Sequence, residues 1–541
     1  MIACSFLIVL IFAVFGKILY HTPINYDLYM EHPVVRSGLN SHSLFWAFTT
    51  GIDGNWIPLT WLSHLIMIQL FGTEMFYHFG LNLILHMGNT LILYLLFQKM
   101  TGDDWISFLV AAIFAIHPLH VESVAWLAER KGLLSSFFSL FACLFYCSES
   151  QNRKHILSGL FFFLALMAKP SAVVLPIIFL LLDFWPLQRW QKQRYKLLFL
   201  EKIHFFIFAL IFTGITYYFQ FQAGAKVERA WDARMLNIFQ SYGLYIIKIL
   251  VPYPLIPFYP FCITKLFLIE SIIFGPLIVW ILFWLWKQKK RFPMIFWGGW
   301  VYVIFLLPVC GIIPFGTQSM ADRYMYLPLI GISAAWIGAL PKLWLKIVMP
   351  FFIFLWSLLS LMQADHWRDS ITLWRHTLQY SPSNSLAHSC LASIYHEQKK
   401  ILSAWRHWGY ILPDGYPSKE FYFHLGLYFH RLGIKKEAKR YYLLAIKRKE
   451  RYAEALNNLG LLFKEEGKLD DAEKYFKHCI QASSECYEAY FNLGDLYFLQ
   501  GKYSEALSQL KMARFYNPYL AEARQNIYFL ESRIPHSACQ S

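Results

Sequence analysis

Residues 453–486 read AEALNNLGLLFKEEGKLDDAEKYFKHCIQASSEC, and residues 487–520 read YEAYFNLGDLYFLQGKYSEALSQLKMARFYNPYL. The second stretch repeats the first at a shift of 34 residues. The positions kept in the first stretch are Leu459, Gly460, Gly467 and Ala472, and they recur as Leu493, Gly494, Gly501 and Ala506. The same period reaches back to Leu425, Gly426, Gly433 and Ala438, and then to a less regular copy with Leu391, Ala392 and Ala404.

A 34-residue period with small residues where helices cross is the tetratricopeptide pattern. Each unit is a pair of helices that buries its apolar face only by stacking on its neighbours. We therefore predict an α-solenoid over 364–541, with about four repeats, a leading half-repeat and a capping helix over 521–533. Arrays of this kind present a concave groove, so we expect a protein or peptide partner there.

The rest of the chain has a different composition. Overall, 57% of the residues are hydrophobic and only 15% are charged, which is not typical of a soluble protein. Up to about Met362 the chain reads as hydrophobic blocks separated by short polar loops, and after QADHWRD (363–369) it becomes charged and helix-forming. We predict an all-α chain in which a polytopic membrane domain (1–363) precedes the repeats (364–541).

The hydrophobic blocks predict about eleven membrane spans. They lie at 2–20, 76–97, 106–117, 132–147, 156–168, 171–184, 203–222, 267–286, 292–308, 324–340 and 347–362. The first has no basic stretch before it, so we interpret it as a retained anchor. A further segment, 236–252, runs into VPYPLIPFYP, whose prolines stop a helix, and is interpreted as re-entrant or interfacial.

Basic loops predict the orientation. Loops 189–202 and 287–291 are the most basic, and the positive-inside rule assigns both to the cytoplasm. The N-terminus is then cytoplasmic and the repeat domain external. Much of the net charge of +15 lies in such short loops, so we expect a lipid bilayer and no nucleic acid as partner. The absence of Asn-x-Ser/Thr sites favours a bacterial inner membrane, with the repeats in the periplasm.

Charged residues gather in the loops that this topology places outside: 117–132, 167–171 and 316–324, besides Asp27 after the first span. The members are Glu122, Glu129, Arg130, Lys131, Lys169, Asp322 and Arg323. External cations run against the usual bias, and an anionic ligand such as the phosphate of a lipid carrier explains them. The alternative is that each cation pairs with a neighbouring acid, as Arg323 with Asp322.

Polar residues also follow one helix face at His78, Asn82 and His86, with His117 and His120 able to lie nearby. They are interpreted either as hydrogen-bond partners of a sugar or phosphate, or as a cluster that satisfies itself between helices. The nine cysteines show no zinc spacing. We predict no metal ligands and no certain cofactor, and a divalent cation stays an option.

Six motifs stand in a fixed order before the repeats. They are NYD (25–27), GNWIPLTWLSH (54–64), HFGLNLILH (78–86), IHPLHVESVAWLAERKGLLS (116–135), MAKP (167–170) and ADRYMYLP (321–328). Over nearly its whole length the chain thereby resembles the transmembrane and tetratricopeptide-repeat-containing O-mannosyltransferases and their bacterial relatives. The resemblance implies the C-type glycosyltransferase fold and a polyprenyl-phosphate-linked sugar donor, used at the outer face.

The resemblance also implies roles for individual residues. Asp27 matches the family's catalytic base, which takes the proton of a Ser/Thr hydroxyl during an inverting transfer of a sugar such as mannose. Fixed cations would stabilise the leaving phosphate, and the candidates are Arg323, Arg130, Lys131 and Lys169. The family's second acid after the tyrosine is absent, since Leu28 follows Asp27. The acid that the family has after Glu-Arg-Lys is also absent, since Gly132 follows Lys131. Glu31 and Glu122 are further polar candidates.

The expected activity is therefore that of a polyprenyl-phosphate-sugar-dependent protein O-glycosyltransferase. Two alternatives stay open: a lipid-carrier transporter, because charges inside a membrane also mark transport pathways, and a catalytically inactive scaffold in which only the repeats work.

Overall fold

The computed structural model describes residues 2–25, 28–148, 151–192, 195–223, 230–312, 318–411 and 419–532. The chain divides into two compact units. The bundle unit comprises Met1–Asp27 and Ser41–Tyr380, and the repeat unit comprises Leu28–Asn40 and Ser381–Ser541.

The boundary between the units lies after Tyr380, later than the expected position after residue 363. Helix α19 (Ser370–Tyr380), assigned from the sequence to a leading half-repeat, belongs to the bundle unit. It is held there by polar contacts, since Trp374 Nε1 donates to Asn25 Oδ1 at 2.8 Å and a ring nitrogen of His376 lies 3.2 Å from the Leu255 carbonyl oxygen.

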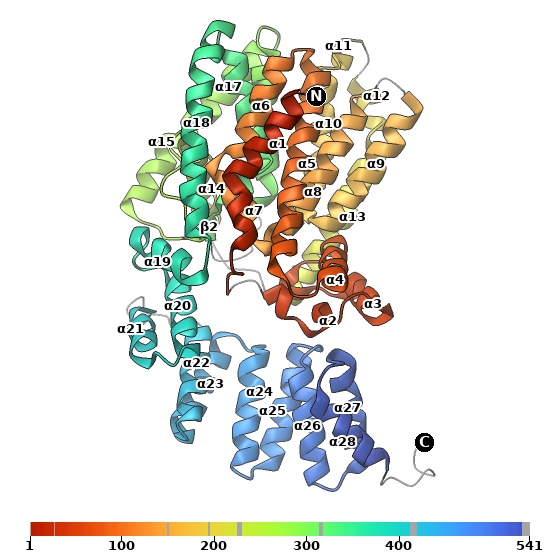
Figure 1. The fold of residues 1–541 in the computed structure, drawn as a ribbon, viewed down its shortest axis with the longest axis vertical. Helices are drawn as coiled ribbons and strands as arrows, with labels where there is room; N and C mark the ends of the chain where they lie inside the picture. The colour runs from red at the N-terminus through yellow and green to blue at the C-terminus, as the bar shows by residue number, and fades with distance from the viewer. Residues whose placement is uncertain are drawn as a thin grey trace. The chain divides into compact units, whose positions relative to one another are not determined.

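The bundle unit is built from helices joined by short 3₁₀ turns (Figure 1). Its first half contains α1 (Ile2–Phe15), η1 (Gly16–Tyr20), α3 (Ser41–Thr49), η3 (Ile52–Gly54), α4 (Pro58–Phe71), α5 (Met75–Thr101), α6 (Asp104–Ile116), η4 (Pro118–His120), α7 (Val121–Ala125), η5 (Leu127–Glu129), α8 (Arg130–Tyr146), α9 (Gln151–Ala168), η6 (Pro170–Val174) and α10 (Leu175–Phe184). Its second half contains α11 (Arg189–Lys192), α12 (Tyr195–Leu200), α13 (Ile203–Gln222), α14 (Trp231–Leu250), α15 (Lys265–Gln288), α16 (Pro293–Leu306), η7 (Leu307–Val309), η8 (Asp322–Met325), α17 (Pro328–Ala339), α18 (Lys342–His366) and α19.

Each of the eleven segments predicted as spans is largely helical, but the helices differ in length. Among the described residues, five helices are long and apolar enough to cross a membrane: Ile2–Tyr20, Met75–Thr101, Ile203–Gln222, Lys265–Gln288 and Lys342–His366. The bent pair Asp104–Ile116 and Pro118–Ala125 makes a sixth if it counts as one span. Among the described residues, the helices of spanning length therefore number five or six, and the total of about eleven spans stays a prediction.

Proline explains the shorter helices. α16 and α17 both begin at a proline, and η6 begins at Pro170, where α9 has just ended. A helix of 14 residues, such as α16, extends only about 21 Å, less than the roughly 30 Å of a bilayer core. In the 236–252 segment, α14 ends at Leu250, directly before the proline-rich stretch, as the sequence predicts.

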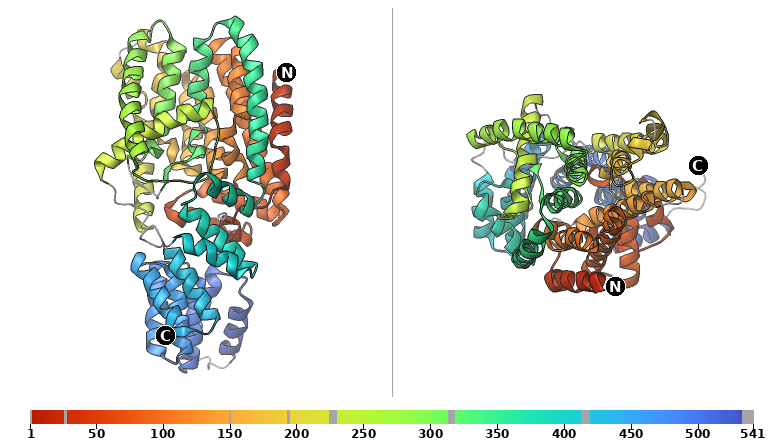
Figure 2. Two further views of the ribbon diagram at one scale, coloured as in Figure 1. Left: turned by 90° about the vertical axis from the view of Figure 1, so that its left-hand side faces the viewer. Right: turned by 90° about the horizontal axis from the view of Figure 1, so that it is seen from above.

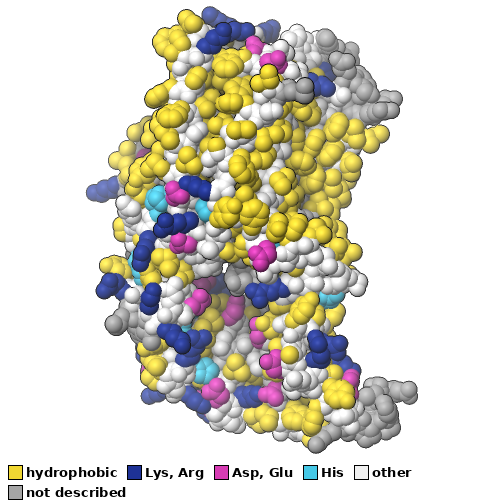
Figure 3. Space-filling view, in the orientation of Figure 1, with side chains coloured by type: hydrophobic (Ala, Val, Ile, Leu, Met, Phe, Trp, Pro, Cys, Tyr) yellow, Lys and Arg dark blue, Asp and Glu magenta, His cyan; other side chains and the backbone are white. Residues whose placement is uncertain are grey.

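The outer faces of the long helices are apolar. Val9, Leu210, Ile272 and Phe354 are between 64% and 73% exposed, on α1, α13, α15 and α18 respectively. Figure 3 shows hydrophobic side chains over much of the bundle face, with basic side chains gathered at its upper end. Four of the five long helices bury only 17–33% of their apolar window inside the protein. Exposed apolar surfaces of this extent are unfavourable in water.

One feature departs from the all-α prediction. Tyr259–Pro260 (β1) pairs in antiparallel fashion with Gln318–Met320 (β2). Proline keeps residues 251–260 from forming a helix, and the extended chain is free to pair. This short ladder matters because it holds Tyr259 beside the 3₁₀ turn η8, which carries Asp322.

Over the described part of 381–532, the repeat unit forms four helix pairs and a final single helix. They stack side by side (Figure 2). The pairs are α20 (Ser385–Glu397) with α21 (Ile401–Ile411), α22 (Lys419–Arg431) with α23 (Lys435–Arg448), α24 (Ala453–Glu465) with α25 (Leu469–Ala482), and α26 (Tyr487–Leu499) with α27 (Tyr503–Tyr516); α28 (Ala521–Glu531) follows. The segment 28–40 also belongs to this unit and forms η2 (Leu28–Glu31) and α2 (Pro33–Arg36).

Small residues set the spacing of the repeat helices. A Cβ atom on Gly460 would lie 2.7 Å from the Phe476 ring, and one on Gly494 would lie 2.8 Å from Leu510. Only glycine lets the two helices of each pair approach this closely. Gly467, between α24 and α25, has a φ of +77°, a backbone conformation that side chains disfavour. Of the repeated glycines, Gly460 and Gly494 therefore lie where the fold leaves no room for a side chain, and Gly467 lies where the backbone needs a positive φ.

Candidate functional site

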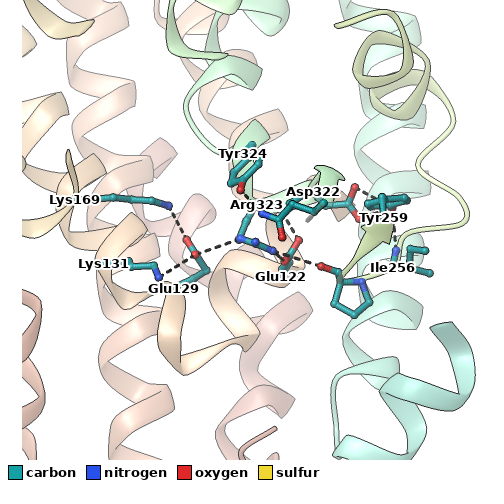
Figure 4. A network of polar contacts seen from close by, with 12 residues as sticks. Glu122, Glu129, Lys131, Lys169, Ile256, Tyr259, Asp322, Arg323 and Tyr324 are labelled. Atoms are coloured by element: carbon teal, nitrogen blue, oxygen red, sulfur yellow. Dashed lines mark hydrogen bonds and ion pairs between the residues drawn. The ribbon is translucent and has the colours of Figure 1, made fainter. Parts of the chain in front are cut away.

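Three loops predicted to lie at one end of the bundle come together in the structure (Figure 4). The segment after α6 supplies Glu122, Glu129 and Lys131; the junction of α9 and η6 supplies Lys169; and η8 supplies Asp322 and Arg323. Lys248 from the last turn of α14 and Tyr259 from β1 join them. We call these eight residues the charged cluster.

Arg323 lies at the centre of the charged cluster. Its backbone N–H donates to Glu122 Oε2 at 2.9 Å, and its Nη1 lies 2.5 Å from Glu122 Oε1. Its Nε lies 3.5 Å from Glu129 Oε1, and the guanidinium carbon lies 5.1 Å from the centroid of the Trp126 ring. Arg323 thus pairs with two acids from a distant segment rather than with the adjacent Asp322.

Glu129 faces cations on both sides (Figure 4). Lys169 Nζ lies 2.9 Å from Oε2, and Lys131 Nζ lies 4.0 Å from Oε1, opposite Arg323. The Glu129 side chain is only 3% exposed. Burial alone would raise the pKa of this carboxyl, but the ammonium groups of Lys169 and Lys131 and the Arg323 guanidinium hold the pKa below its usual range. Glu129 is therefore a buried anion that fixes three cations.

Asp322 has partners of its own that the sequence analysis did not identify. The Tyr259 hydroxyl donates to its carboxylate at 2.9 Å, and Lys248 Nζ lies 3.9 Å away while it donates to the Tyr259 hydroxyl at 2.7 Å. Burial raises the pKa of Asp322, against the opposing effect of Lys248 and Tyr259. A usable signal was present in the sequence, because Lys248 is a lone cation inside an otherwise apolar helix segment.

The charged cluster borders a small cavity of about 50 Å³. Glu129, Lys169, Arg323 and Tyr324 line it, together with serines that include Ser123. The Ser123 hydroxyl is buried and makes no hydrogen bond within the described part of the chain. Two cations, Lys169 and Arg323, and one carboxylate, Glu129, line the cavity, which leaves an excess of positive charge in its wall.

Arg130, predicted as a phosphate contact, lies in a different set of bonds. Its side chain is fully buried, with Nε donating to Asn82 Oδ1 at 3.0 Å and Nη2 donating to the His78 carbonyl at 2.8 Å. Nη1 lies 3.0 Å from His64 Nδ1. These bonds tie α8 to α4 and α5. The geometry favours a positioning role for Arg130 and Asn82 rather than contact with a phosphate.

The candidate histidines are also engaged inside the protein. His86 lies 2.8 Å from the Tyr326 hydroxyl and 2.9 Å from the Ala115 carbonyl oxygen through its two ring nitrogens. His117 lies 3.0 Å from the Ile249 carbonyl oxygen and accepts from the Leu119 N–H at 3.2 Å. His78 and His120 contact backbone carbonyls at 2.9 Å and 2.7 Å. The cluster satisfies itself only in part, because His78 Nδ1 and His120 Nε2 are buried without a hydrogen-bond partner among the described residues.

Asp27, the predicted catalytic base, lies outside the described residues, and the Glu31 side chain is likewise not described. Asn25, two residues before Asp27, is bonded to Trp374 and also donates its N–H to Ser370 Oγ at 2.8 Å. Within the described ranges, no group of three or more His, Cys, Asp or Glu side chains is placed to hold a metal ion.

Comparison with known proteins finds relatives of the repeats. Residues 451–514 and residues 419–452 each match a family described as tetratricopeptide repeat. The C-terminal region carries tetratricopeptide repeats. This confirms the prediction made from the 34-residue period, and repeats of this kind are typical of protein-interaction scaffolds. The glycosyltransferase family and its fold stay predictions. No curated protein matches the chain.

Solved structures with similar repeats include YrrB, a TPR protein with an unusual peptide-binding site, at 22% identity over 29% of this chain and 80% of that chain, with a TM-score of 0.24. The first TPR of Spaghetti (RPAP3), bound to an HSP90 peptide, shows 16% identity over 21% of this chain and 92% of that chain, with a TM-score of 0.21. A thermophilic TPR protein of Thermus thermophilus, TTC0263, shows 20% identity over 34% of this chain and 96% of that chain, with a TM-score of 0.27.

Proposed function

We propose that this protein is a membrane glycosyltransferase that moves a sugar from a polyprenyl-phosphate carrier to a Ser/Thr hydroxyl of an external protein. The observation that carries the proposal is the charged cluster, in which loops far apart in the sequence place Lys169 and Arg323 at the wall of a cavity. A site with excess positive charge suits a leaving group that develops negative charge on phosphate oxygens.

In this proposal the chemistry is a single displacement. A bond forms between the acceptor oxygen and the anomeric carbon, while the bond from that carbon to the phosphate oxygen breaks and its electron pair stays on the phosphate. Asp27 accepts the hydroxyl proton. Lys169 and Arg323 line the cavity and meet the phosphate charge, while Glu129 and Glu122 hold these cations in place before the donor arrives.

The exposed apolar faces of α1, α13, α15 and α18 support a location in a bilayer. The basic loops favour a cytoplasmic N-terminus, with the charged cluster and the repeat unit on the external side, in the periplasm if the protein is bacterial. The repeat unit would then bind the protein acceptor on the side of the membrane where transfer takes place and raise its local concentration.

Transfer from a panel of radiolabelled polyprenyl-phosphate sugars to Ser/Thr peptides, catalysed by purified protein in lipid nanodiscs, tests this function. We expect Lys169→Met to raise the donor KM roughly tenfold or more, since a charge-assisted hydrogen bond is worth about 1.5–3 kcal/mol. Lys342→Met, at an 80% exposed lysine, is the matched control and should leave the donor KM unchanged. No transfer from any donor would refute the proposal.

The tetratricopeptide match favours a second candidate, a membrane-anchored interaction scaffold without catalysis. A scaffold would retain a partner through the repeat unit and would show no dependence of any product on Asp27. A lipid-carrier transporter would instead move the carrier between leaflets of a proteoliposome without an acceptor. Product formation that Asp27→Asn abolishes distinguishes the enzyme from both.

A further inference from the structure

The bundle unit contains a second and much larger cavity, of about 910 Å³. It lies between the end of α10, helices α11 and α12, the end of α15 and the start of α16. α16 shows that the two cavities are at opposite ends of the bundle: Pro293 at its start lines the large cavity, and Phe305 near its end lines the small one. In Figure 1, α11 and α12 lie at the upper end of the bundle, and α7 and β2 lie toward its lower end.

The walls of the large cavity are aromatic and incompletely buried. Trp185, Trp286 and Phe199 line it, with Leu198 beneath them. Trp286 is 48% exposed and Phe199 is 46% exposed, so the cavity opens on an apolar surface that the protein itself does not cover. Aromatic side chains of this kind are enriched where a membrane meets water.

Two lysines add positive charge to one side of this cavity. Lys289 Nζ lies 3.6 Å from the centroid of the Trp286 ring, and Lys290 is its neighbour in the lining. No carboxylate in the described part of the chain forms an ion pair with either lysine. Two other cations at this end do form ion pairs: Arg189 Nη1 lies 3.0 Å from Asp183 Oδ1, and Lys202 Nζ lies 2.5 Å from Asp183 Oδ2. The charge that faces the cavity is therefore available to a ligand.

We propose that this cavity binds an anionic phospholipid, with the phosphodiester at Lys289 and Lys290 and the acyl chains along the aromatic wall. The cavity volume of about 910 Å³ is at the upper end of the range for ligand pockets. It suits a phospholipid headgroup together with the first part of the acyl chains. Basic pockets between helices on the cytoplasmic side bind anionic headgroups, and the basic loops assign this end to that side. The site rests on the bilayer insertion proposed above, but it lies apart from the charged cluster.

Native mass spectrometry of the detergent-purified protein, loaded with phosphatidylglycerol or phosphatidylcholine, tests the site. We expect the protein to retain phosphatidylglycerol in preference to phosphatidylcholine. In Lys289→Gln/Lys290→Gln the affinity for phosphatidylglycerol should fall about thirtyfold, or roughly fivefold per lysine. The control Lys342→Gln/Lys346→Gln removes two basic residues at the start of α18 and should retain the lipid as the wild type does.

A second arm separates a lipid headgroup from free phosphate as the source of the anion. Inorganic phosphate at millimolar concentration should not displace phosphatidylglycerol from the wild-type protein. Displacement by phosphate, equal retention of the two lipids, or unchanged retention in the Lys289/Lys290 variant would each overturn the proposal. The measurement uses no sugar donor, so its failure is distinguishable from failure of the transfer reaction.

Discussion

Replacing Glu129 by glutamine removes a carboxylate that faces three cations while it preserves the shape of the side chain. At an effective dielectric constant of about 20, the attraction across 2.9 Å to Lys169, 3.5 Å to Arg323 and 4.0 Å to Lys131 amounts to roughly 6, 5 and 4 kcal/mol. Desolvation of the buried groups cancels much of this sum. Breaking a buried pair by removing one partner costs about 3–5 kcal/mol, and we expect the free energy of unfolding to fall by that amount.

The assay is reversible unfolding of the purified protein in mixed micelles titrated with SDS, followed by circular dichroism. The control Glu74→Gln changes an exposed glutamate of the same unit and should stay within about 0.5 kcal/mol of the wild type. The double variant Glu129→Gln/Lys169→Met should be less destabilised than the sum of its single variants, because the two residues act as a pair. A change below about 0.5 kcal/mol in Glu129→Gln would refute the reasoning.

The same substitution predicts a pH dependence. The pKa of Glu129 is held low in the folded protein, so its stabilising effect is fully present above the unfolded value of about 4.3 and is lost as the pH falls through the folded pKa. The difference in unfolding free energy between wild type and Glu129→Gln should therefore be constant from pH 7 to about pH 5. It should then shrink toward pH 3. A difference that grows on acidification would contradict the assigned direction of the shift.

Three further outcomes are expected. Asp27→Asn should abolish sugar transfer without changing folding or membrane insertion, and normal turnover by the purified variant would remove Asp27 from the mechanism. Gly460→Val should lower the stability of its repeat by about 1–3 kcal/mol or more, because a Cβ atom there meets the Phe476 ring at 2.7 Å. A melting curve by circular dichroism that matches the wild type would contradict this. Lys202→Met should destabilise the bundle unit by about 3–5 kcal/mol, since it leaves the fully buried Asp183 with one cation fewer. Unchanged unfolding in SDS would show that this ion pair is dispensable.

The sequence and the structure agree best where the determinants are local. The 34-residue period places glycine at 460 and 494 because two helices cross there, and the structure has them crossing at those residues. Helix ends are also determined by nearby residues, since α14 ends at Leu250, directly before the proline-rich stretch. Such features depend on neighbours in the chain, so they can be read without knowing the fold.

For the charged cluster, the sequence predicts which loops meet but not which charges pair. The topology derived from hydrophobic blocks and basic loops assigns the loops 117–132, 167–171 and 316–324 to one side, and the structure brings their charges together. The partners of each charge were not predictable. Arg323 has an acid next to it in the sequence, yet it pairs with Glu122 and Glu129, because adjacent side chains on a 3₁₀ turn point in different directions.

The sequence by itself determined the repeat array, the predominance of helix and the placement of cationic loops at one end of the bundle, since these follow from periodicity, composition and charge. The tertiary structure alone decided that α19 packs with the bundle unit and which five or six of the described helices reach membrane-spanning length. It alone brought Lys248 and Tyr259 to Asp322. These results depend on contacts between residues tens to hundreds of positions apart, and such contacts leave no periodic trace in a single sequence.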